Sequence, residues 1–138
     1  VVNKLEGTPM SISEFPELMT TEYLRSHPDI VFVFGDNLIR RGKGGAAALR
    51  DEPNAYGFIT KKYPNNLDSS FYKPVEYKKV FNEEVEKLTQ FMLANPDKVL
   101  VISKLGAGLA NKYRIYEEVI RDGLNHFQEI YYKQVVLM

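Results

Sequence analysis

Two glycine-rich stretches, residues 35–45 and 106–111, are the parts of this sequence whose composition points to chemistry. Each follows an apolar run, 30–34 or 99–102, of the kind typical of a strand buried on both faces of a sheet. Glycine lets backbone N–H groups come close to a ligand, and successive N–H groups at the start of a helix favour an anion. In open α/β sheets, ligands bind outside the carboxyl ends of the strands. The sequence therefore predicts that the two loops hold a diphosphate from both sides.

The first stretch follows neither of the common nucleotide-binding patterns. Gly42-Lys43-Gly44-Gly45 is followed by Ala46, so no hydroxyl is supplied for magnesium as in a GxxxxGK[ST] loop. The spacing of its glycines does not fit GxGxxG either. For each loop taken alone, a tight turn that needs a positive φ angle explains the glycines equally well. Two such loops, each placed after an apolar strand, favour ligand binding.

An alternation of strands and helices is expected to position these loops. Apolar, β-branched and aromatic runs predict strands at residues 30–34, 55–60, 99–102 and 130–137. Apolar residues at helical spacing predict helices from about Ser11 to His27, at 46–50, at 80–92 and at 115–127. Residues 61–74 read as a long irregular loop, which in a compact domain is often functional. This order indicates a three-layer α/β/α domain with a largely parallel sheet.

Three segments carry a resemblance to a known family. Residues 33–48 resemble the macrodomain stretch in which a strand ends in Asn and a glycine-rich loop follows. Residues 101–109 resemble the second loop of that family, in which a strand leads into a G-x-G-hydrophobic turn. Residues 56–61 resemble a segment found in uncharacterised macro-like proteins of bacteria and phages. The chain from residue 30 to 138 is therefore similar to the macrodomain superfamily, which includes ADP-ribose-binding and Appr-1''-p processing proteins.

The resemblance implies a fold and a set of binding residues. The fold would be a macrodomain-like α/β/α sandwich with a mixed, largely parallel sheet, and the ligand would be ADP-ribose or a related NAD-derived nucleotide. Asn37 would contact the distal ribose of that ligand, and the first loop would lie against this ribose and the diphosphate. The second loop would hold the diphosphate through backbone N–H groups. The loop residues that the resemblance implies are Gly42, Gly44, Gly45, Gly106, Ala107, Gly108, Leu109 and Ala110.

One departure from the family bears on catalysis. A hydrolase branch of the macrodomains places a catalytic Asp directly after the G-x-G-L turn, and this sequence has Ala110 there. The departure favours a binding module over the first alternative, an enzyme that cleaves an ADP-ribosyl bond or processes an ADP-ribose-type signal. The second alternative is an interaction scaffold that has lost the ligand. No catalytic residue is assigned.

For several side chains near the loops, the sequence allows two interpretations. Asn37 either reaches the ligand or caps the turn after Asp36, a role that Asn favours. Lys43 either contacts a phosphate or is a solvated loop charge, and the same holds for its neighbours Arg40 and Arg41. Lys61 is a candidate for direct contact with the ligand. Strand geometry places its side chain on the opposite face from that of Lys62. The aromatic residues of the long loop either stack on adenine or pack locally: they are Tyr63, Phe71 and Tyr72.

Composition sets the remaining expectations. The 138 residues suit a single domain spanning 1–138, and the net charge of zero makes a nucleic-acid partner unlikely. The sequence has no cysteine, its acidic pairs lack the spacing of a metal site, and neither of its two histidines has a catalytic partner. We therefore expect no metal and no cofactor. Without an apolar run long enough to span a membrane or a secretory leader, we expect a cytoplasmic protein. The resemblance to macro-like proteins implies that it is bacterial or phage-encoded.

Overall fold

The computed structural model describes residues 15–138 and has an α/β fold. Its sheet has four strands in the order β2-β1-β3-β4, and each of the three pairings is parallel. Each connection between consecutive strands contains a helical segment, so each strand returns to the sheet in the same direction. The sheet of the described residues is therefore parallel throughout rather than mixed. The strands are β1 (Ile30–Asn37), β2 (Ala55–Lys61), β3 (Val99–Ile102) and β4 (Val135–Leu137).

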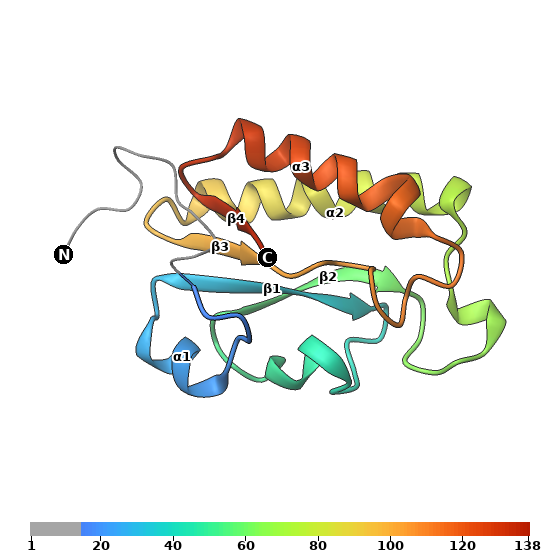
Figure 1. The fold of residues 1–138 in the computed structure, drawn as a ribbon, viewed down its shortest axis with the longest axis horizontal. Helices are drawn as coiled ribbons and strands as arrows, with labels where there is room; N and C mark the ends of the chain where they lie inside the picture. Colours follow the sequence, from blue (N-terminus) through green and yellow to red (C-terminus); the bar gives the residue numbers. More distant parts are fainter. Residues whose placement is uncertain (1–14) are drawn as a thin grey trace.

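The helices lie on both faces of this sheet, so the expected three layers are present (Figure 1). The long helix α2 (Pro74–Ala94) and α3 (Arg121–Ile130) cover one face. The short helix α1 (Thr21–Ser26) and a 3-10 helix (Gly45–Leu49) cover the other. No helix in the described part of the chain is both long enough and apolar enough to cross a membrane.

The central strands are buried on both faces, as their apolar runs predict. Along β1, Val31 and Val33 belong to the core beneath α2 and α3. The alternate residues Phe32 and Phe34 belong to the core on the α1 side. Because successive side chains of a strand point to opposite faces, one continuous apolar run supplies both cores.

Several element ends differ from the sequence expectation. The first helix was expected from Ser11, which lies outside the described residues, but the described helix begins at Thr21. The hydroxyl of Thr20 accepts the N–H of Tyr23 and so caps the helix there. At the other end of the chain α3 continues to Ile130, and the final strand is only Val135–Leu137.

Candidate functional site

A cavity of about 640 Å³ opens at the carboxyl edge of the sheet. Because the strands are parallel, β1, β2 and β3 all end at this edge, and the segments after them surround one space. Of Asn37, Lys43, Lys61 and the loop residues that the resemblance implied, only Ala107 is not among those that line the cavity. Arg40 and the aromatic residues of the long loop, which the sequence left open, do not line it either. Those that line it are Asn37, Gly42, Lys43, Gly44, Gly45, Lys61, Gly106, Gly108, Leu109 and Ala110.

The side chain of Asn37 holds the first loop in shape. Its Nδ2 donates to the carbonyl oxygen of Arg41 at 2.7 Å, and its Oδ1 accepts the N–H of Ile39 at 3.1 Å. Asn37 is also buried, although it lines the cavity. These contacts match the turn-capping interpretation, because both ends of the amide are engaged within the loop.

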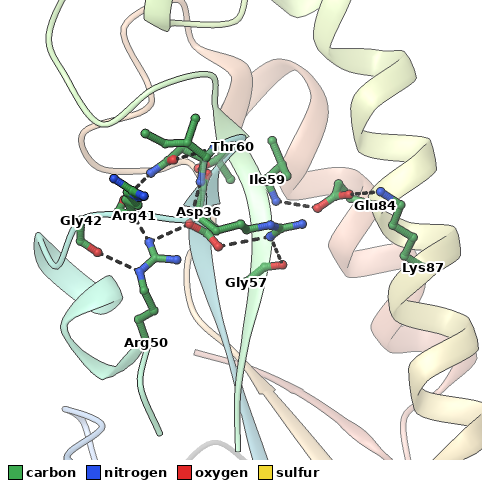
Figure 2. A network of polar contacts seen from close by, with 12 residues as sticks. Asp36, Arg41, Gly42, Arg50, Gly57, Ile59, Thr60, Glu84 and Lys87 are labelled. Carbon is green, nitrogen blue, oxygen red and sulfur yellow. Dashed lines mark hydrogen bonds and ion pairs between the residues drawn. The ribbon is translucent and has the colours of Figure 1, made fainter. Parts of the chain in front are cut away.

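Asp36 is a buried carboxylate at the base of this loop (Figure 2). Its Oδ1 accepts Nη2 of Arg50 at 2.7 Å and the N–H of Asn37 at 2.8 Å, and its Oδ2 accepts Nη1 of Arg40 at 3.2 Å. Burial alone would raise the pKa of Asp36, but these hydrogen bonds outweigh burial and hold the pKa below its ordinary value. Asp36 is therefore ionised at neutral pH and binds two guanidinium groups.

The backbone of β2 is shaped to accept this carboxylate. Gly57 lies beside Asp36, and a Cβ atom at Gly57 would stand 2.2 Å from Oδ2 of Asp36. The carbonyl oxygen of Gly57 also accepts Nη1 of Arg40 at 3.0 Å. The absence of a side chain at Gly57 is thus a requirement of the buried carboxylate on the neighbouring strand.

Arg50 connects the end of the 3-10 helix to the first loop (Figure 2). Its Nε donates to the carbonyl oxygen of Gly42 at 2.9 Å, and its Nη2 donates to that of Arg41 at 3.2 Å as well as to Asp36. Its guanidinium carbon also lies 5.3 Å from the centre of the Phe34 ring. Sequence reasoning did not single out Arg50, because a partner fourteen positions away from Asp36 leaves no local pattern.

The two glycines of the second loop have different surroundings. Gly106 has a φ of +77°, and a Cβ there would lie 2.4 Å from Cδ1 of Ile120, so the turn and its packing both require glycine. At Gly108 a Cβ would meet no atom within 4 Å. Gly106 is therefore structural, whereas Gly108 leaves open space beside the cavity.

Positive charge predominates among the titratable groups of the cavity. Arg41, Lys43, Arg50, Lys61 and Lys104 line it, and Asp36 is the only acidic residue among the lining residues.

Three of these cations have no acidic partner in the part of the chain that the structure describes. They are Arg41, Lys61 and Lys104, whereas Lys43 is paired with the exposed Asp51. Nζ of Lys61 lies 4.7 Å from the centre of the Phe71 ring, and burial lowers the pKa of this lysine. A cavity with this balance of charge favours an anionic ligand.

The structure also shows where the other side chains lie whose roles the sequence left open. Lys61 and Lys62 do point apart: Lys61 lines the cavity, while Lys62 pairs with Glu76 at 3.2 Å. Phe71 and Tyr72 are buried, which matches local packing, and Tyr63 is 45% exposed. Among residues 15–138 no group of three or more His, Cys, Asp or Glu side chains is placed to hold a metal ion.

The fold and the site together define an α/β protein with a parallel sheet and a cationic cavity at its carboxyl edge. Residues 14–112 match the model of a family of unknown function, DUF7831, and the chain belongs to this family. No curated protein and no solved structure matches the chain.

Proposed function

We propose that the protein binds ADP-ribose or a related NAD-derived nucleotide in the cavity at the carboxyl edge of the sheet. The observation that carries this proposal is the meeting of two glycine-containing loops with five cationic side chains around one space of about 640 Å³. Loops of this kind offer backbone N–H groups to a diphosphate, and the cations offset its charge. The volume suits a small-molecule ligand.

The resemblance to macrodomains supports the choice of ligand. The segments that carry it, residues 33–48 and 101–109, include both loops of the cavity. The contacts of Asn37 within its loop support a role in shaping the site rather than a contact with the distal ribose. The diphosphate is then the part of the ligand to which the cavity is best suited.

The lining of the cavity favours binding over hydrolysis. Asp36 is the only carboxylate among the lining residues, and its oxygens already accept two guanidinium groups and one N–H. Ala110 stands where a hydrolase branch of the macrodomains has an acid, and it is buried. A general base for activating water therefore has no candidate among the carboxylates that line the cavity.

Isothermal titration calorimetry tests the proposal. The chain is titrated with ADP-ribose, NAD, ADP and cyclic ADP-ribose isomers, each with and without EDTA. We expect ADP-ribose or one of its relatives to bind in a metal-independent manner, because the cavity is lined by glycine-containing loops and cations rather than by a carboxylate cluster. The absence of binding by all four ligand types would exclude the proposed function, and loss of binding with EDTA would exclude a metal-independent site.

A further inference from the structure

The guanidinium of Arg50 is held from one side by the protein itself. Three hydrogen bonds from Nε and Nη2 reach the carbonyls of Gly42 and Arg41 and the carboxylate of Asp36. The side chain of Arg50 is only 14% exposed. An arginine fixed in this way has lost most of its rotamer freedom before any ligand arrives.

The third nitrogen of the same group has no partner. No hydrogen bond joins Nη1 of Arg50 to any residue of the described chain. No unpartnered side-chain nitrogen or oxygen in residues 15–138 is fully buried, so Nη1 is accessible to solvent. Arg50 lines the cavity, and Nη1 is the only nitrogen of its guanidinium that has no partner among the described residues.

The charge of Arg50 is only partly neutralised by Asp36. The one carboxylate is shared between Arg50 and Arg40, so the cluster of three side chains retains a net charge of +1. Arg40 is half exposed and does not line the cavity, whereas Arg50 does. Of the two arginines that share this positive charge, Arg50 is therefore the one at the cavity.

From this geometry we propose that Arg50 is an anion-binding residue of the cavity, and that its Nη1 donates to a phosphate oxygen of the ligand. Asp36 is then a positioning residue, which fixes the guanidinium without touching the ligand. The proposal rests on the proposed function for the identity of the nucleotide but requires only that the ligand carries a phosphate group. Guanidinium donors suit phosphate oxygens, and a pre-positioned donor loses little entropy on binding.

The test compares Arg50→Gln with the matched variant Arg40→Gln. Both substitutions remove one positive charge and one hydrogen bond to Asp36, but only Arg50 lines the cavity. Arg50→Gln also removes two bonds to carbonyls of the first loop, and Arg40→Gln also removes one bond to the carbonyl of Gly57. Calorimetry with ADP-ribose and with inorganic pyrophosphate measures the affinity of each variant. We expect Arg50→Gln to weaken both ligands roughly 10- to 100-fold, and Arg40→Gln to weaken them less than about threefold.

The outcomes separate this inference from the proposed function. If pyrophosphate binds in an Arg50-dependent manner and ADP-ribose does not bind, the inference stands and the proposed function fails. If ADP-ribose binds equally well to the parent and to Arg50→Gln, the proposed function stands and the inference fails. Equal losses in both variants would show that Arg50 acts only through Asp36, and a parent that binds neither ligand would also overturn the inference.

Two further measurements keep the inference testable if Arg50→Gln does not fold. Arg50→Lys retains the charge and one bond to Asp36 but loses the planar set of donors, so we expect it to weaken pyrophosphate binding as well. In the unaltered chain, the side-chain ¹⁵N resonance of Arg50 is expected to shift when pyrophosphate is added. An unshifted Arg50 resonance at saturating pyrophosphate would overturn the inference without any substitution.

Discussion

Asp36 has surroundings that explain how a charged side chain is tolerated at the base of the cavity. It is 4% exposed, yet its oxygens accept an N–H and two guanidinium groups. A buried charge is stable only when it is paired and hydrogen-bonded, and the missing side chain at Gly57 provides the space. The same contacts stabilise the conformation of the first loop, because Arg50 links Asp36 to the loop carbonyls.

Replacing Asp36 with Asn is expected to destabilise the protein by about 2–4 kcal/mol at neutral pH, because two guanidinium groups lose their carboxylate. The pKa of Asp36 is lowered in the folded state, so its contribution is complete above the unfolded pKa and is lost as pH falls through the folded one. The difference between parent and variant should therefore shrink in acid. Urea unfolding from neutral pH to below pH ~3 measures it.

Asp51→Asn is the control for this experiment, since Asp51 forms an exposed pair with Lys43. We expect little change in the free energy of unfolding from this variant. A gap between parent and Asp36→Asn that stays constant down to low pH would contradict the role given to the ionised carboxylate.

Asn37→Ala separates the two interpretations of that side chain. Both ends of its amide bond within the loop, so the variant should weaken ADP-ribose and ADP by the same factor, roughly three- to tenfold. It should also lower the melting temperature, because the loop loses the buried side chain that caps it. Paired titrations and thermal unfolding measure these effects. A loss of affinity confined to ADP-ribose would instead support a contact between Asn37 and the distal ribose.

At the scale of elements, the site is made by the segments that come after three strand ends. The apolar runs of β1 and β3 identify them as buried strands, and the glycines that follow identify both loops. The helix boundaries were less predictable, because the end of a helix depends on single capping contacts such as that of Thr20. Arg50 could not be found in this way, since its role depends on folding that brings it against Asp36.

The second loop provides a prediction at this scale. Gly108→Val should fold almost as well as the parent, because a Cβ at this position meets no atom within 4 Å, but its side chain would occupy the space beside the cavity. Affinity for ADP-ribose should fall at least about tenfold, since the displaced diphosphate would lose hydrogen bonds to the loop. Calorimetry and urea unfolding measure the two effects.

Gly106→Val is the contrasting variant in the same loop. Position 106 has a positive φ angle, and a valine there would place its Cβ against Ile120. The free energy of unfolding should therefore fall by at least about 1–3 kcal/mol. If Gly108→Val folds and binds ADP-ribose as the parent does, the second loop is not the diphosphate site.

At the scale of the whole molecule, overall charge and local charge diverge. The chain has equal numbers of basic and acidic residues, whereas cations predominate among the residues that line the cavity. The net charge of the chain therefore does not predict the charge of the cavity. The parallel sheet causes the difference, because it brings the segments after three strands to one edge. Basic residues that are far apart in sequence, such as Arg41, Lys61 and Lys104, thereby surround one space.

If the local field attracts the ligand, removing one cavity charge must matter more than removing a charge elsewhere. Lys104 lines the cavity and has no acidic partner in the described chain, whereas Lys79 lies on α2 and pairs with Glu83 at 4.0 Å. Lys104→Gln should weaken ADP-ribose roughly three- to tenfold, and Lys79→Gln, with the same net charge, should bind as the parent does. High salt should reduce the difference, because the Debye length falls from about 10 Å at 0.1 M to about 3 Å at 1 M. Calorimetry at both salt concentrations measures the effect. Equal affinities for the two variants at low salt would mean that the charge of Lys104 does not act on the ligand.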